Sequence, residues 1–240
     1  MLTNDDGFGA AGIVALENVL AAEHEVYVIA PESERSGSSN AFTVHEKLTL
    51  VKIDSCHYTI SGYPADCVNV GLKAGIVPDV DCVVSGINIG PNLGYDVFFS
   101  GTVGAARMGY VCGKPSFAVS IDTRDTASPY IKDAADWFAE FFAMQRFDEP
   151  CLININYPNI AAPEGLEYAT LARRNYTDRY AATETANGMS LVIEGEPAEA
   201  NLRNGEDAGA IARGFIAITP LTTDCCDHVA LNKLRSERRG

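Results

Sequence analysis

The sequence predicts an α/β fold with a doubly wound, mainly parallel, Rossmann-like sheet. Over residues 1 to about 120, short apolar runs alternate with segments of helical periodicity, as in repeated βαβ units. The apolar runs are continuous rather than alternating, as in strands that are buried on both faces. Residues 165–195 are more polar and strand-like, and we expect them to form a projecting β-hairpin arm. The chain, residues 1–240, is interpreted as one domain that includes this arm.

Each element follows from its own pattern. Apolar runs predict strands at residues 2–3, 26–30, 82–84, 117–120, 152–155 and 215–219. Helical spacing of apolar residues predicts helices at residues 12–23, 65–75, 102–113, 129–146 and 207–213. Gly113 and Pro115 are expected to end the third of these helices.

The composition limits the classes of partner. The chain carries 18 basic and 32 acidic residues, a net charge of −14, which disfavours general binding to DNA, RNA or anionic membranes. No apolar run reaches the roughly 18–20 residues of a membrane span. The first residues lack the pattern of a signal peptide. Seven cysteines without C-x-x-C spacing are interpreted as reduced thiols, so a cytoplasmic location is expected.

Asp5 and Asp6 directly follow the first predicted strand. Ligands of open α/β sheets collect beyond the carboxyl ends of the strands, so this pair is expected at a functional edge. Adjacent carboxylates repel each other unless a cation neutralises them, and Mg²⁺ or Mn²⁺ would do so with oxygen ligands. A solvated turn is the alternative interpretation, since Asn, Asp and Gly are ordinary turn residues.

A rival interpretation comes from residues 7–12, which match the dinucleotide-binding pattern G-x-G-x-x-G. Glu32 lies near the position of the ribose-binding carboxylate, so a nicotinamide-dependent oxidoreductase is an alternative. Against it, Asp5 and Asp6 would repel a pyrophosphate, and the chain offers no clear hydride-transfer constellation.

Two further polar segments are expected at the same edge. Residues 31–40 follow the second strand and are rich in hydroxyl groups. Residues 85–96 follow the strand at 82–84 as a long irregular loop, and long loops are often functional. Ser100, Gly101 and Thr102 then open a helix, where hydroxyls and free amides suit a phosphate group; a simple N-cap is the alternative.

Together these segments resemble the survival protein E (SurE) family of 5′/3′-nucleotidases. The resemblance is carried by residues 3–7, 30–31, 35–37, 62–68, 84–94, 100–103, 154–158 and 218–221, in that order. It therefore extends almost from end to end and is more specific than any single motif.

The resemblance implies a metal-dependent phosphomonoesterase that hydrolyses nucleoside 5′-monophosphates, with 3′-monophosphates as a further substrate class. Asp5 and Asp6 would be catalytic and would bind one divalent ion, Mg²⁺ or Mn²⁺, together with Ser36 and Asn88. The residues expected near the phosphate are Asn4, Asn92, Ser100, Gly101 and Thr102. The expected assembly is a homodimer or tetramer formed through the arm.

The start of the sequence departs from the family pattern. Only Met1 and Leu2 precede Thr3, so the first strand is expected to be short. This feature keeps a third possibility open, a metal or nucleotide binder without catalytic turnover.

Overall fold

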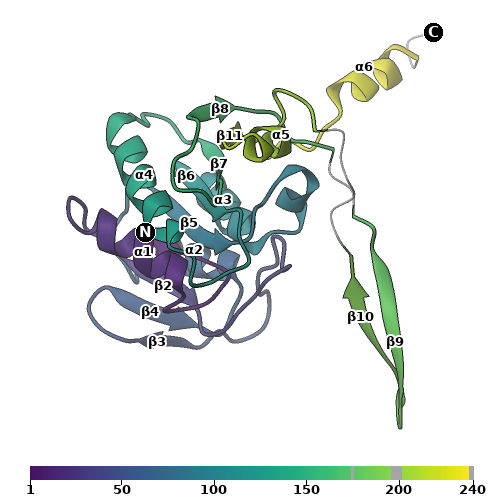
Figure 1. The fold of residues 1–240 in the computed structure, drawn as a ribbon. Coiled ribbons are helices and arrows are strands. Elements are labelled where there is room, and N and C mark those ends of the chain that lie inside the picture. Colours follow the sequence, from purple (N-terminus) through teal and green to yellow (C-terminus); the bar gives the residue numbers. More distant parts are fainter. Residues whose placement is uncertain (174–175, 196–201, 238–240) are drawn as a thin grey trace.

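The computed structural model describes residues 1–173, 176–195 and 202–237 (Figure 1). The strands of the main sheet are β1 (Leu2–Thr3), β2 (Val28–Pro31), β3 (Leu50–Lys52), β4 (His57–Ile60), β5 (Val83–Ile89), β6 (Ser116–Ile121), β7 (Leu152–Tyr157), β8 (Leu166–Tyr168) and β11 (Ile216–Pro220). The hairpin strands are β9 (Arg179–Thr185) and β10 (Gly188–Glu194). The helices are α1 (Ala11–Leu20), α2 (Pro64–Lys73), η1 (Gly94–Phe98, a 3-10 helix), α3 (Gly101–Val111), α4 (Tyr130–Met144), α5 (Asp207–Ala212) and α6 (His228–Glu237).

The main sheet has the order β3-β4-β2-β1-β5-β6-β7-β11-β8. The six strands from β4 to β7 in this order are parallel to their neighbours. Antiparallel pairing occurs where β3 meets β4 and where β11 meets β7. The predicted doubly wound, mainly parallel α/β fold is therefore confirmed.

Helices cover both faces of the sheet, and the strand pleat divides the apolar side chains between them. Along β2, Val28 and Ala30 belong to the core cluster that contains the buried faces of α1 and α4. Ile29, between them, packs with Cys67 and Val68 of α2 on the other face. This arrangement explains why the central strands have continuous apolar sequences.

The chain reverses its direction of winding at β1 and β5. After β1 it continues into α1 on one face, whereas after β5 it continues into α3 on the other. The carboxyl ends of β1 and β5 are therefore a topological switch point, where the diverging connections of an open α/β sheet leave a crevice for a ligand.

The strand predicted at residues 82–84 is longer than its apolar run suggests. β5 continues to Ile89, because Asn88 pairs with Ser120 and Ile89 with Ile121 of β6 after an irregularity that follows Ser85. The first part of the predicted loop, residues 85–89, is therefore strand. Gly86 allows this irregularity: its φ is +138°, and an added Cβ would lie 2.2 Å from the carbonyl oxygen of Val119.

The C-terminal part differs from the prediction in two ways. The hairpin is formed by residues 179–194, whereas β8, also within the expected arm at 165–195, pairs with β11 in the main sheet. Residues 174–175 of that arm, and residues 196–201 and 238–240 of the expected domain, lie outside the described residues. α6 was not expected from the sequence, and with the hairpin it extends away from the body of the molecule (Figure 1).

The helix predicted at residues 12–23 is also shorter than expected and ends at Leu20. None of the helices in the described residues is both long and apolar enough to cross a membrane.

Candidate active site

The three polar segments expected at one edge meet in the structure. They follow β2, β1 and β5, which are neighbours in the sheet. The backbone N–H of Arg35, in the segment after β2, donates to the carbonyl oxygen of Asp5 at 2.7 Å. The backbone N–H of Ser39 donates to the carbonyl oxygen of Phe99 at 2.9 Å, next to the start of α3. The segment after β2 is thus fastened to both of the others.

Asp5 is buried beside the first turn of α3. The residue is only 3% exposed, and the hydroxyl of Thr102 donates to its Oδ1. Burial raises the pKa of Asp5 above its usual value, because the charged form loses hydration, while the Thr102 hydrogen bond opposes that rise. Thr102 therefore holds Asp5 in place and favours its ionised form.

Asp6 is the more accessible member of the pair. Burial, with a further contribution from the charge of Asp5, raises the pKa of Asp6 to about 6. The backbone N–H of Ile89 donates to Asp6 Oδ2 at 3.4 Å, which places Asp6 against the end of β5. Among the described residues, no lysine or arginine forms an ion pair with either carboxylate. Two adjacent carboxylates without a cation are a donor set that suits a divalent metal ion.

A third carboxylate lies near this pair and was missed by sequence reasoning. After burial and hydrogen bonding, the charge of Glu34 is a further cause of the raised pKa of Asp5 and Asp6. The hydroxyl of Ser36, a predicted metal ligand, is exposed and donates to Glu34 Oε1 at 2.9 Å. Glu34 could have been predicted as a site residue from its position in the segment after the second strand, two residues before Ser36.

The start of α3 packs directly on Asp5. Ser100 is the N-cap: its Oγ accepts the backbone N–H of Val103 at 3.1 Å. Gly101 leaves room for the carboxylate, since an added Cβ would lie 2.9 Å from Asp5 Cβ and 3.0 Å from Asp5 Oδ2. The first N–H groups of a helix lack intrahelical acceptors, so this end of α3 can bind an anion beside the carboxylate pair.

The predicted asparagines lie at the same edge and have internal partners. Asn88, near the end of β5, is half-buried and donates to the carbonyl oxygen of Gly90 at 2.7 Å, which leaves its own amide oxygen for another partner. Asn4 is fully buried and donates to the carbonyl oxygen of Gly7 at 2.9 Å. Asn92 donates to Ser120 Oγ at 2.8 Å. Asn4 and Asn92 thus shape the loops, and the phosphate-binding role expected for them stays a prediction.

Asp207 holds the loop after β5 from a distant part of the chain. This buried carboxylate accepts the backbone N–H of Gly94 at 2.8 Å, that of Ala172 at 2.9 Å and that of Ala208 at 2.7 Å. Burial raises the pKa of Asp207, and the three N–H donors oppose the rise. Sequence reasoning missed this residue, and its only local signal was an aspartate in the first turn of a predicted helix.

The glycines at residues 7–12 have structural explanations here. Gly7 and Gly9 have positive φ angles of 102° and 79° in the turn between β1 and α1. An added Cβ on Gly12 would lie 1.9 Å from the carbonyl oxygen of Ile87, so Gly12 allows α1 to approach β5 closely. The turn and the close packing account for the G-x-G-x-x-G pattern without a dinucleotide.

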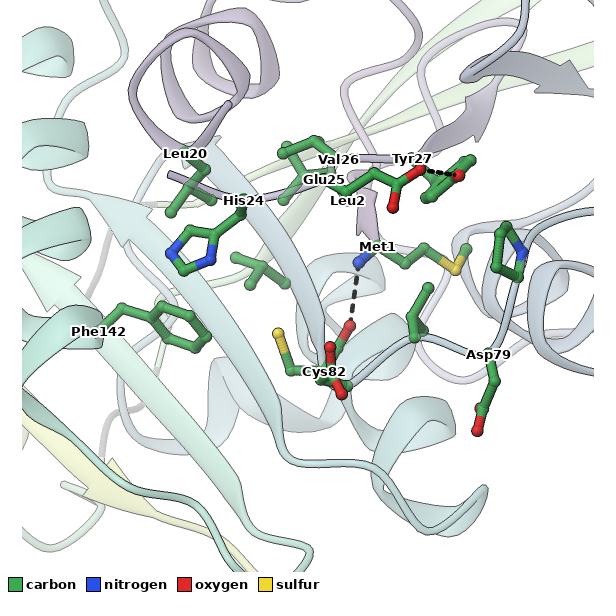
Figure 2. A pocket seen from close by; sticks show the side chains of 14 residues that line it. Met1, Leu2, Leu20, His24, Glu25, Val26, Tyr27, Asp79, Cys82 and Phe142 are labelled. Carbon is green, nitrogen blue, oxygen red and sulfur yellow. Dashed lines mark hydrogen bonds between the residues drawn. The ribbon is translucent and has the colours of Figure 1, made fainter. Parts of the chain in front are cut away.

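A separate pocket of about 170 Å³ lies at the opposite end of β1 (Figure 2). Its lining includes Met1, His24, Cys82 and Phe142, and none of the predicted site residues. The terminal ammonium of Met1 donates to the carbonyl oxygen of Cys82 at 3.0 Å, and burial lowers the pKa of this group. This pocket is therefore distinct from the polar edge that carries Asp5 and Asp6.

The fold and the edge define a class of protein: a doubly wound α/β protein with a carboxylate pair and a helix N-terminus at its switch point, suited to a metal ion and a phosphate group. The family model described as "Survival protein SurE" matches residues 1–178. The chain belongs to this family, as the resemblance implied.

Individual relatives are similar to this chain over nearly their whole length. A protein of Leptospira biflexa named "5'-nucleotidase SurE" is 39% identical over 245 residues, which cover 99% of each chain. One of the same name from Leptospira interrogans is 38% identical and covers 98% of this chain and 95% of its own. The solved structure of the SurE protein from Aquifex aeolicus has a TM-score of 0.85 at 31% identity, covering 99% of this chain and 98% of its own. These similarities give no support to the dinucleotide-binding alternative.

Proposed function

We propose that this protein is a 5′-nucleotidase, a metal-dependent phosphomonoesterase that hydrolyses nucleoside 5′-monophosphates to nucleoside and phosphate, with 3′-monophosphates as a further substrate class. The observation that carries the proposal is the pair of buried Asp5 and half-buried Asp6 at the switch point of the sheet, beside the N-terminus of α3. Family membership and the names of the relatives supply the nucleotide as substrate.

The residues at this edge fit a hard divalent ion, Mg²⁺ or Mn²⁺. Asp5 and Asp6 would bind it with the oxygens of Ser36 and Asn88, and the two carboxylates would balance its charge. Ser36 is exposed on the segment that is fastened to Asp5, so a side-chain rotation can turn its hydroxyl away from Glu34. When bound, such an ion polarises the phosphoryl group and lowers the pKa of a bound water.

The chain's own residues would supply the proton transfer and the stabilisation of charge. The carboxylate of Asp6, or that of Asp5, would orient the attacking water and accept its proton. The first turn of α3, at Ser100, Gly101 and Thr102, would stabilise the charge that develops on the phosphate oxygens, together with Asn88 and Asn92. The backbone N–H of Thr102 also faces the carboxylate of Asp5, and the N–H of Gly101 is the first one open to the phosphate. Asn4 would stabilise the conformation of the turn after β1 through its hydrogen bond to Gly7.

We also propose that the protein acts in the cytoplasm as a homodimer or tetramer formed through the β9–β10 hairpin. The hairpin exposes apolar side chains that a partner hairpin would cover; those more than half exposed include Met189, Leu191, Val192 and Ile193. Light scattering coupled to size-exclusion chromatography tests this assembly: Val192→Glu should yield monomer, and a monomeric wild type would refute it.

The test of the enzyme is release of inorganic phosphate from a panel of nucleoside 5′- and 3′-monophosphates with Mn²⁺, Mg²⁺ or EDTA. We expect release that requires metal and is lost in Asp6→Asn but kept in the control Asp79→Asn, an exposed acidic residue at the opposite end of the sheet. Nucleotide binding without phosphate release would instead identify a non-catalytic binder and refute the proposed activity.

A further inference from the structure

A second group of potential metal ligands lies in the segment between β11 and α6. Asp224, Cys226 and His228 place a carboxylate oxygen, a thiol sulfur and an imidazole nitrogen within 4.8 Å of one another. All three side chains are exposed. None of them belongs to the edge that carries Asp5 and Asp6, and the proposed nucleotidase activity does not use them.

Hydrogen bonds already organise this segment. The backbone N–H of Leu221 donates to the carbonyl oxygen of Leu152 at 2.8 Å, which anchors the segment to β7. Asp224 Oδ1 accepts the backbone N–H of Cys226 at 2.9 Å, and its Oδ2 lies 2.6 Å from Nε2 of His228. Asp224 therefore holds the side chain of His228 directly and fixes the backbone at Cys226.

We propose that Asp224, Cys226 and His228 bind a borderline divalent ion of the Zn²⁺ type. Thiolate and imidazole ligands favour Zn²⁺, whereas Mg²⁺ and Ca²⁺ require oxygen ligands, so this donor set selects against the ion of the active site. Three protein ligands leave the fourth tetrahedral position to a water molecule.

The geometry is close to that of a tetrahedral site. Bond lengths of about 2.0–2.3 Å place the ligand atoms of a tetrahedral zinc ion about 3.3–3.7 Å apart. The His228–Asp224 pair must open by roughly 0.7 Å, and Cys226 Sγ must move by about an ångström, which rotation of exposed side chains permits. Binding releases the thiol proton of Cys226, and Nε2 of His228 must carry no proton when it binds the ion. The ion would then fasten the first turn of α6 to the segment that precedes it.

The neighbouring cysteine provides a matched control. Cys225 is exposed like Cys226 but is not a member of the ligand group. It lies instead near the guanidinium of Arg107 on α3. Burial lowers the pKa of Arg107, and Cys225 opposes that shift only in part. Replacing either cysteine with serine removes one exposed sulfur atom, and only Cys226→Ser removes a proposed ligand.

Cobalt substitution tests the proposal, because a thiolate bound to Co²⁺ gives a sulfur-to-metal charge-transfer band that an oxygen-only site cannot give. We expect one equivalent of Co²⁺ to produce this band in reduced, metal-free wild type, in Cys225→Ser and in Asp6→Asn. The band should be absent in Cys226→Ser, and Co²⁺ should bind His228→Asn at least about tenfold more weakly. Zn²⁺ should displace the cobalt and Mg²⁺ should not.

The opposite results would overturn the assignment. No band at one equivalent of Co²⁺, or a band that persists in Cys226→Ser, means that Cys226 is not a ligand. Loss of the band in Asp6→Asn would mean that the thiolate site is not independent of the active site. Because this readout is spectroscopic, it is independent of whether the protein releases phosphate.

Discussion

Replacing Thr102 with valine removes the hydroxyl that donates to Asp5 and leaves the shape of the side chain nearly unchanged. Thr102 is fully buried, and its hydroxyl donates to Asp5 Oδ1. Valine keeps the branched shape, so the helix and its packing on the sheet should remain. The carboxylate then loses its side-chain donor at a place where water cannot readily replace it, because Asp5 is only 3% exposed.

The size of the effect follows from the chemistry of that hydrogen bond. A hydrogen bond to a charged group contributes about 1.5–3 kcal/mol, which corresponds to roughly 10- to 150-fold in an equilibrium constant. The bond favours ionised Asp5, so its loss raises the pKa of Asp5 further and makes a metal ion compete with a proton. We therefore expect Thr102→Val to bind Mn²⁺ at least about tenfold more weakly near neutral pH.

Calorimetric titration of Mn²⁺ into metal-free protein measures this change, and Thr102→Ser is the matched control because it retains the hydroxyl. The serine variant should bind Mn²⁺ within about threefold of wild type, and raising the pH should recover part of the affinity lost in the valine variant. Equal affinities of wild type and Thr102→Val, or equal losses in both variants, would refute the reasoning.

Three further predictions concern the surroundings of the site. Gly101→Ala should lower kcat/KM while the protein stays folded, because the new Cβ would press on Asp5 at 2.9–3.0 Å; steady-state kinetics and circular dichroism measure the two effects. Asp207→Asn should lower the free energy of unfolding in urea by about 1–3 kcal/mol, because its amide NH₂ would face a backbone N–H that the carboxylate now accepts. Burial alone would lower the pKa of His57, but hydrogen bonds with Asp54 and Glu17 outweigh it and raise this pKa. The contribution of His57 is thus present at pH values below its unfolded pKa of about 6.5 and is lost as pH rises through the folded pKa. Wild type should exceed His57→Gln in unfolding free energy by about 0.2–1 kcal/mol at pH 6, and by less at pH 9.

These three have clear contrary outcomes. Unchanged turnover in Gly101→Ala would mean that Asp5 is not tightly packed under α3. An unfolding curve of Asp207→Asn that matches wild type would mean that the loop after β5 is held by other contacts. A stability difference for His57→Gln that grows with pH would reverse the assigned sign.

The sequence was sufficient to predict the structure where the local pattern of residues determines it. Asp5 and Asp6 follow an apolar strand and precede a helix, so their place at the carboxyl edge could be predicted from the order of the elements. Ser100 could likewise be predicted as a cap, because a hydroxyl residue before an apolar helix commonly accepts an N–H of the first turn.

The sequence was insufficient to predict the structure where contacts between residues far apart in the chain determine it. Asp207 binds Gly94, which is 113 residues away, and no local pattern links them. The extension of β5 to Ile89 depends on pairing with β6, which overrides the loop-forming tendency of its glycine. β8 joins the main sheet for the same reason, since β11 provides the edge on which it pairs.

The most direct test of the account is the number of Mn²⁺ ions that bind with high affinity to metal-free protein, measured together with Asp5→Asn, Asp6→Asn and the control Asp79→Asn. The account predicts one such ion in wild type and in Asp79→Asn, and a loss of affinity of at least about tenfold in each of the other two variants. Undiminished binding in both Asp5→Asn and Asp6→Asn would contradict the claim that this carboxylate pair is the metal site on which the proposed nucleotidase activity depends.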